Sequence, residues 1–299
     1  MNYLIFQAYG NTDILNECRY AVLSLLKHKP TLDTIHIVIY TDQKEFFSSL
    51  PTQSITYVAL SQEDITRYKG KHGFVHRLKI KIIQDAMSRF SGKLLYSDSD
   101  VYFLKPVDSL FDKIDDSRFV MCNNEGAINI KGNRVFEKFS HFIASHKAYL
   151  KTNEVVIPTD VTMWNAGIIG IQSTDKDKVA DVLRVCDVLL DRFSSHVIEQ
   201  LAFSHVLHNH GVIEPATDVV FHYWNLKEFR KVLAEFFAFH DQNSSLETMV
   251  ADVDAIRPDR LIKPKMEYES LSFILKALRK LKGKSNRWVF PTYHIGKNA

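Results

Sequence analysis

Short apolar runs alternate with stretches of helical periodicity along most of this chain. Residues Ile35 to Thr41 form a near-continuous β-branched run, which is typical of a strand buried on both faces of a sheet. Comparable runs predict strands over 3–8, 54–59, 94–96, 119–122, 164–171 and 219–224. Helical spacing predicts helices after Asn11 and after Ser61, and over 43–50, 73–90, 106–114, 134–149, 176–193 and 196–208. Strands that alternate with helices are joined by crossovers, so we expect an α/β fold with a Rossmann-like, mixed but mostly parallel sheet and helices on both faces.

Composition fits either one large α/β domain with extensions or two smaller domains in 299 residues. Hydrophobic residues make up 45% and charged residues 24%, which is ordinary for a globular protein, and a net charge of +3 does not favour a nucleic-acid partner. The cysteines, Cys18, Cys122 and Cys186, are far apart, which suits a reducing compartment and offers no metal-binding spacing. The sequence shows neither a signal-peptide pattern nor an apolar run long enough to cross a bilayer, so we expect a cytoplasmic protein.

Two carboxylates, Asp98 and Asp100, follow the predicted strand 94–96, at the edge of the sheet where α/β proteins bind ligands. Side chains alternate in an extended segment, so both carboxylates lie on the same side. Two hard oxygen ligands so placed suit Mg²⁺ or Mn²⁺, whose other ligands are usually waters and substrate phosphates. The pair predicts a divalent-metal site, and a solvated acidic turn is the structural alternative.

A basic helical segment precedes this pair. Helical spacing over 73–90 places Arg77 and Lys81 on one face of a helix that leads into strand 94–96. Their charges would then lie near a diphosphate held by the metal. A solvated basic face is the ordinary alternative for any one of these side chains.

The C-terminal stretch 270–288 has a different pattern. Leucine and isoleucine residues at helical spacing form an apolar stripe, and six lysine and arginine residues surround it. This pattern is typical of a basic amphipathic helix that lies on an anionic membrane surface, although a helix packed on its own domain has a similar stripe. We therefore expect residues 241–299 to form a helical, basic extension, with peripheral attachment to the inner face of a membrane as one reading.

The order of these pieces resembles the GT-A class of nucleotide-sugar glycosyltransferases, and is closest to the family that contains glycogenin and the bacterial lipopolysaccharide galactosyltransferases. The matching parts are the small-residue turn Ala8-Tyr9-Gly10-Asn11, the basic segment 76–81, the Asp98-Ser99-Asp100 signature, the Asn165-Ala166-Gly167 strand and the pair Glu199-Gln200. Together they cover roughly residues 1–224. We expect a GT-A-like catalytic domain over 1–240, with an inserted flap near 127–160 where the strand rhythm is lost.

The resemblance implies a metal-dependent transfer of a sugar from a nucleotide diphosphate-sugar, most often a UDP-hexose, to a glycan, lipid-linked or lipopolysaccharide-type acceptor. Mn²⁺ or Mg²⁺ would join Asp98 and Asp100 to the two phosphates. The implied donor-binding residues are Ala8, Tyr9, Asn11, Asp42, Arg77, Lys81, Ser99, Ala166 and Gly167, and the implied catalytic residues are Asn165, Glu199 and Gln200. Structural alternatives stay open, since Asn165 can cap a bend and Glu199 can be a solvated helix residue.

The third metal ligand is the point at which the chain departs from the family pattern. Family members carry a His-x-x-Gly-x-x-Lys motif whose histidine binds the metal. Here the segment from His222 to Lys227 lacks the glycine and has its lysine one place early, and His294 in 293–297 is a rival. We favour His222 because it follows a predicted strand, although it can also be an ordinary buried imidazole.

Two other classes of protein remain as alternatives. A haloacid-dehalogenase-like phosphatase also has Asp-x-Asp after an apolar strand, usually the first strand of the chain. A non-catalytic nucleotide- or carbohydrate-binding protein of the same fold would keep the site without turnover. Retention of anomeric configuration is implied by the resemblance alone, since an inverting enzyme would instead use a carboxylate to deprotonate the acceptor.

Overall fold

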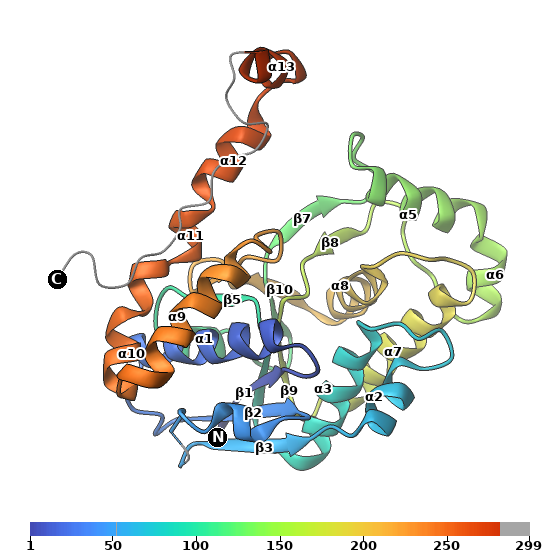
Figure 1. Cartoon of the computed structure of the whole chain (residues 1–299). Helices are drawn as coiled ribbons and strands as arrows, with labels where there is room; N and C mark the ends of the chain where they lie inside the picture. The colour runs from blue at the N-terminus through green and yellow to red at the C-terminus, as the bar shows by residue number, and fades with distance from the viewer. Residues whose placement is uncertain (52, 282–299) are drawn as a thin grey trace.

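The computed structural model describes residues 1–51 and 53–281, and a seven-stranded sheet runs through its centre (Figure 1). The strand order is β10-β6-β9-β4-β1-β2-β3. These strands are β1 (Asn2–Gln7), β2 (Ile35–Thr41), β3 (Ile55–Ala59), β4 (Lys93–Ser97), β6 (Arg118–Met121), β9 (Ile168–Gln172) and β10 (Val212–Pro215). Within this sheet β9 alone runs antiparallel to its neighbours, β4 and β6. The expected α/β class with a mixed, mostly parallel sheet is confirmed.

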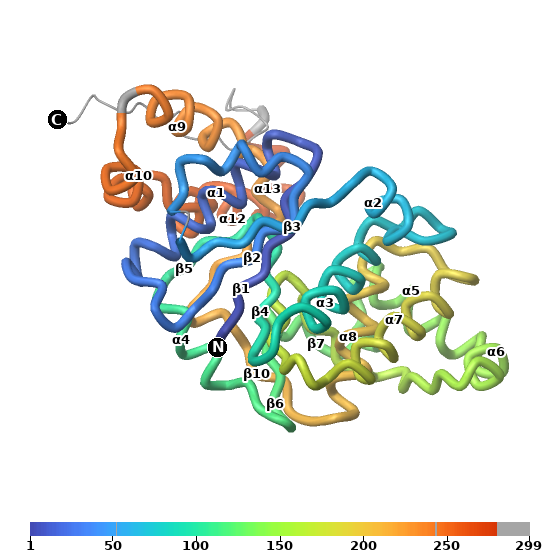
Figure 2. Tube along the Cα trace, turned by 90° about the horizontal axis from the view of Figure 1, so that it is seen from below, coloured from blue at the N-terminus to red at the C-terminus, as the bar shows by residue number. Residues whose placement is uncertain are grey.

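Helices cover both faces of the sheet, because alternate strand residues supply two separate cores. In β1, Leu4 and Phe6 belong to one core and Ile5 to the other. The first core is closed by α1 (Thr12–His28), α9 (Phe229–Asn243), α10 (Leu246–Asp252) and the 3₁₀ turn η2 (Val253–Ile256), and the second by α3 (Arg77–Arg89), α7 (Lys176–Leu190) and α8 (Ile198–His210). Figure 2 shows these two groups of helices on opposite sides of the strands.

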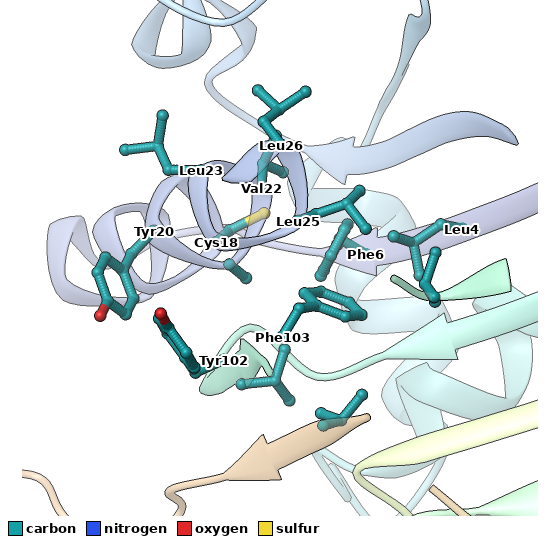
Figure 3. Packing of buried hydrophobic residues seen from close by; sticks show 14 of the residues in the cluster. Leu4, Phe6, Cys18, Tyr20, Val22, Leu23, Leu25, Leu26, Tyr102 and Phe103 are labelled. Carbon is teal, nitrogen blue, oxygen red and sulfur yellow. The ribbon is translucent and has the colours of Figure 1, made fainter. Parts of the chain in front are cut away.

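The first core also holds helices that lie beyond the predicted domain boundary at residue 240. Figure 3 shows Cys18 and Tyr20 of α1 beside Tyr102 and Phe103, which follow the segment 98–100. The Tyr20 hydroxyl donates a hydrogen bond to the carbonyl of Val253, in η2. Residue 240 lies inside α9, and buried side chains of α10 and η2 extend the same core. The division into 1–240 and 241–299 stays a prediction.

Two small antiparallel sheets flank the main one, β5 (Val101–Phe103) with β11 (Val220–His222) and β7 (Asn124–Ala127) with β8 (Thr162–Trp164). The predicted strand 164–171 is in fact two strands, β8 and β9, separated by residues 165–167. The region predicted as a flap lies between β7 and β8 and holds α5 (Arg134–Ser145) and α6 (Lys147–Thr152), where one helix over 134–149 was expected. Shorter elements are η1 (Lys44–Phe47), α2 (Gln62–Lys69) and α4 (Asp108–Asp112).

The chain leaves the body through a C-terminal arm, which we define as α11 (Pro258–Leu261), α12 (Lys263–Ser270) and α13 (Phe273–Leu281). Figure 1 shows α13 at the far end of this arm. Residues 282–288 of the predicted amphipathic stretch, and His294, lie outside the described residues. Among the helices that the structure describes, none combines the length and the apolar character that a membrane span requires.

Candidate metal centre

Asp98, Asp100 and His222 come together from three neighbouring elements. Asp98 directly follows β4, Asp100 directly precedes β5, and His222 ends β11, whose antiparallel register pairs it with Val101. His222 Nε2 lies 3.1 Å from Asp100 Oδ1 and 4.0 Å from Asp98 Oδ2. One ligand atom from each residue falls within 4.8 Å of the other two. The fold thus forms a compact set of two carboxylates and one imidazole.

Asn165 sets the orientation of the His222 ring. The ring Nδ1 donates to Asn165 Oδ1 over 2.9 Å, and the same oxygen accepts the backbone N–H of Gly167 over 2.9 Å. The Asn165 amide nitrogen donates to Glu125 Oε1 over 3.1 Å, which fixes the direction of the amide. Since Nδ1 carries the proton of this bond, Nε2 faces the two aspartates, an arrangement typical of a metal-binding histidine held by its outer partner. The set therefore fits a divalent cation.

Gly167 is required by the position of His222. A Cβ at residue 167 would overlap the Cε1 and Nδ1 atoms of the His222 ring. The backbone carbonyl of Gly167 also accepts the N–H of Asp98 over 2.8 Å. The family resemblance implied Gly167 as a donor-binding residue, and the structure shows that its missing Cβ makes room for the imidazole.

Two lysines neutralise the two aspartates. Lys79 on α3 is buried, and its Nζ donates to Asp98 Oδ2 over 3.0 Å and to the carbonyl of Ala166 over 2.8 Å. The Tyr96 hydroxyl donates to the other oxygen of Asp98 over 2.9 Å. Lys227, which is half exposed, donates to Asp100 Oδ2 over 3.0 Å. Each carboxylate thus has one lysine partner, and Asp100 also pairs with His222 over 3.1 Å.

The sequence analysis did not assign Lys79 to the site. It chose Arg77 and Lys81 on the same helix, and these two side chains have partners elsewhere. Arg77 pairs with both oxygens of Asp187 over 2.7 and 3.0 Å, and Lys81 donates to Gln84 over 2.8 Å. Two positions along a helix turn a side chain by about 200°, so Lys79 points toward the sheet while its two neighbours line an outer hollow between α2 and α3. A signal was present, because Lys79 shares the spacing of the apolar stripe with Ile82, Ile83 and Ala86.

The charges of this centre hold its groups in their ionised forms. Burial acts to raise the pKa of Asp100, but the charges and hydrogen bonds of His222 and Lys227 outweigh it and hold that pKa well below its ordinary value. Burial acts to lower the pKa of His222, and the charge and hydrogen bond of Asp100 reverse this and raise the pKa to about 10. A cation that binds at Nε2 takes the place of the second imidazole proton.

A second set of polar groups adjoins the metal centre. Gln200 on α8 donates to Glu125 Oε2 over 2.7 Å, so Glu125 bridges Gln200 and Asn165. Glu199 is buried, with Oε1 4.0 Å from Lys79 Nζ and 3.7 Å from the Nδ1 of His76. Burial raises the pKa of Glu199. The sequence reading gave Glu125 no role, and its only signal was its place in the polar stretch 123–126, most of which forms β7.

The predicted nucleotide-binding residues lie at the carboxyl ends of β1 and β2. Both oxygens of Asp42 accept the backbone N–H of Gly10 over 3.1 Å, which joins the two strand ends. The side chain of Asn11 caps α1 by accepting the N–H of Asp13. Ala8 is buried, and burial followed by the charge of Asp42 raises the pKa of Tyr9. Ser99 is buried between the two aspartates of the metal centre.

The sequence matches no protein-family model and no curated protein. Among solved structures, the galactosyltransferase LgtC in complex with donor and acceptor sugar analogues matches with a TM-score of 0.47 and 14% identity, over 72% of this chain and 74% of that chain. An active-site mutant of LgtC matches with the same TM-score, identity and share of this chain, over 73% of its own chain. The apo form of mouse xyloside xylosyltransferase 1 matches with a TM-score of 0.44 and 9% identity, over 72% of this chain and 85% of that chain. All three are named as transferases of sugars, and a likeness this distant carries no argument about the activity, substrate or mechanism of this chain.

Proposed function

We propose that this chain is a metal-dependent glycosyltransferase that moves a hexose from a nucleotide diphosphate-sugar, specifically a UDP-hexose, to a carbohydrate acceptor. The observation that carries the proposal is the convergence of Asp98, Asp100 and His222 with a lysine on each aspartate. With His222 neutral, as a ligand must be, the two lysines balance the two aspartates. A divalent cation and a diphosphate add nearly equal and opposite charge, so together they would enter this site without leaving a buried charge unpaired. A cation alone or a diphosphate alone would not.

The residues of the centre have distinct parts in such a reaction. Asp98, Asp100 and His222 would hold Mn²⁺ or Mg²⁺, and the bound cation would supply Lewis-acid neutralisation of the leaving diphosphate. Lys227 is half exposed and can turn from Asp100 to a phosphate oxygen, while Lys79 stays buried and holds Asp98 in place. The bond from the anomeric carbon to the diphosphate breaks with its electrons on the phosphate oxygen, and the acceptor hydroxyl supplies the new bond.

The network behind the metal supports a sugar site. Asn165 and Gln200 are both oriented by the carboxylate of Glu125, and Gln200 also accepts the N–H of Ala166 over 3.4 Å. Such a set of oriented amides and a carboxylate suits the hydroxyls of a hexose. In the retaining course that we favour, the acceptor proton passes to the departing diphosphate oxygen, and no protein base is required. Glu199 and Gln200 then serve to bind and orient the donor sugar.

Trp224 offers a site for the acceptor. It lies two residues after His222 and is 54% exposed, although its neighbours Tyr223 and Leu226 are buried. The loop that carries it is held by the bond from the N–H of Tyr223 to the carbonyl of Asp100. An exposed indole on this loop suits the apolar face of a pyranose ring. The acceptor is therefore a glycan or lipid-linked sugar, and we place the protein in the cytoplasm, at the inner face of a membrane.

The decisive experiment is thermal unfolding with UDP and Mn²⁺, added singly and together. We expect a rise in the melting temperature only when both are present. Asp100→Ala should weaken UDP binding in Mn²⁺ by more than about 100-fold, because it removes a ligand and not merely an outer partner. Asp160→Ala, which changes an exposed aspartate remote from the centre in sequence, is the matched control and should bind as wild type does.

Other outcomes would point to other functions. Equal UDP affinity in Asp100→Ala would remove the aspartate pair from the nucleotide site. Turnover of an aryl phosphate without any UDP effect would indicate a phosphatase, and UDP binding without hydrolysis or transfer across a panel of nucleotide sugars would indicate a binding protein. If transfer is found, the anomeric configuration of the product, read by proton NMR, decides between retention and inversion.

A further inference from the structure

Helix α13, at the end of the C-terminal arm, exposes nearly all of its large apolar side chains. Phe273 is 87% exposed, Ile274 70%, Leu275 50% and Leu278 48%. Residues at these spacings share one broad face of a helix. In Figure 1, α13 stands apart from both cores, at the far end of the arm. The sequence left open that this helix packs on its own domain. In the structure its apolar face is exposed and does not pack there.

The basic side of α13 faces the arm itself. Lys276 Nζ donates to the carbonyl of Glu269 in α12 over 2.9 Å. Lys276 and Arg279 lie 5.5 and 5.8 Å from the ring of Tyr268, also in α12. Lys276 and Arg279 therefore lie on the side of α13 that faces α12, and the exposed apolar side chains lie on the opposite side of the helix.

We propose that α13 docks on the surface of an anionic lipid bilayer, with its apolar face in the interface and its cations at the level of the headgroups. Residues 270–288 carry six lysine and arginine residues and no aspartate or glutamate. That charge complements an anionic surface, and each cation near such a surface adds to the attraction. The same charge opposes pairing of the helix with a second copy of itself, since like charges would lie side by side.

The arm links this docking helix to the loop of the metal centre. Lys265 in α12 donates to the carbonyl of Asn225 and lies 3.4 Å from Glu228. Asn225 lies between Trp224, the acceptor-side residue, and Lys227, which pairs with Asp100. Docking of α13 thus holds this loop at a set distance from the lipid surface, which suits an acceptor sugar carried on a membrane lipid. This last step rests on the proposed function, whereas the docking itself does not.

Vesicle sedimentation with the full chain tests the docking. Wild type should bind vesicles of equal parts phosphatidylglycerol and phosphatidylcholine and should not bind pure phosphatidylcholine. A variant with Phe273→Ser and Ile274→Ser should lose at least about tenfold in binding, because two apolar side chains no longer leave water. Lys276→Gln should lose about fivefold, the share of one charge at such a surface. The double variant Val156→Ser and Val212→Ser changes exposed apolar residues elsewhere and should bind as wild type does.

Three results would overturn the proposal: equal binding to neutral vesicles, unchanged binding of the α13 double variant, or a wild-type dimer in gel filtration that this variant converts to monomer. Vesicle sedimentation requires neither metal nor nucleotide. A chain that does not bind vesicles would therefore refute the docking proposal without bearing on the test of UDP binding. Conversely, a chain that binds vesicles but not UDP with Mn²⁺ would refute the proposed function and leave the docking in place.

Discussion

The metal centre and α13 meet their surroundings in opposite ways. Around the metal centre each side chain has a fixed partner: Lys79 on Asp98, Lys227 on Asp100 and Asn165 on His222. On α13 the large apolar side chains point into solvent, and the bonds it makes run along the arm, as from Lys276 to Glu269. The side chains of the metal centre thus have partners within the domain, whereas the apolar face of α13 is exposed to solvent.

This difference separates two kinds of substitution. In the metal centre a change in one side chain disturbs several bonds at once, so stability and ligand binding should fall together. On the apolar face of α13 a change affects exposed side chains, so stability should hold while an external interaction falls. The contrast can be tested with pairs of variants, and it fails if the two regions respond alike.

The largest effect is expected at Lys79. Lys79→Met leaves an apolar chain of similar length but removes the cationic partner of Asp98 and the bond to the carbonyl of Ala166. Breaking a buried ion pair by removing one partner is strongly destabilising, so we expect a loss of about 3 kcal/mol in the free energy of unfolding. Urea unfolding measures it directly.

Lys81→Met is the matched control, because it makes the same change one half-turn along the same helix. Lys81 contacts Gln84 in the outer hollow, and its loss should change the free energy of unfolding by less than about 0.5 kcal/mol. If Lys81→Met weakens UDP binding and Lys79→Met does not, the sequence-based choice of Lys81 is right and the place assigned to Lys79 is wrong.

Gly167→Ala should have the next largest effect. The added methyl group has to displace the imidazole of His222, and overpacking of this kind costs about 1–3 kcal/mol. UDP binding in Mn²⁺ should fall with it. In a His222→Ala background the imidazole is absent, so the same glycine change should cost much less. Equal costs in the two backgrounds would show that the glycine serves the backbone and not the imidazole.

The parts of the fold that could be predicted from the sequence are those with a strong local pattern. The β-branched run at 35–41 and the amphipathic pattern at 77–89 became β2 and α3, because periodicity and burial agree there. The pair Asp98 and Asp100 was visible because both carboxylates flank short apolar strands. Residues 164–171 were misread as one strand, because the turn at 165–167 is set by the bonds of Asn165 to His222 and Glu125, far apart in the chain.

The residues that the sequence did not reveal are those whose position depends on packing between distant elements. Glu125 comes to Gln200 through the β7 and β8 pairing, across 75 residues of chain. Lys79 was visible only as a charge on an apolar stripe, and its partner Asp98 directly follows β4, the next strand along the chain. The apolar stripe singled out Lys79 among the three basic residues of the helix, but no local pattern records which carboxylate it faces. Such choices are made by the tertiary fold.

A smaller effect is expected at Trp224, which tests whether the exposed side of the metal-centre loop behaves as a binding surface. With the best acceptor from a panel of methyl hexosides, Trp224→Ala should raise the acceptor KM about tenfold, the usual weight of an exposed tryptophan at a binding site. Hydrolysis of the donor should be unchanged. Trp224→Phe should restore most of the acceptor affinity, since the aromatic face is kept. An equal loss of donor hydrolysis would place Trp224 on the donor side instead.

The smallest effect is expected at Ile274 of α13, and Ile256 of η2, in the same C-terminal region, is the contrast to it. Ile256 in η2 is fully buried in the first core, and Ile274 in α13 is 70% exposed. Ile256→Ser creates a cavity and buries a hydroxyl, so it should cost about 3 kcal/mol in urea unfolding. Ile274→Ser should cost less than about 0.5 kcal/mol and should leave UDP binding unchanged. A large loss of stability in Ile274→Ser would mean that α13 packs on the domain in solution, which would leave no free face for a lipid surface.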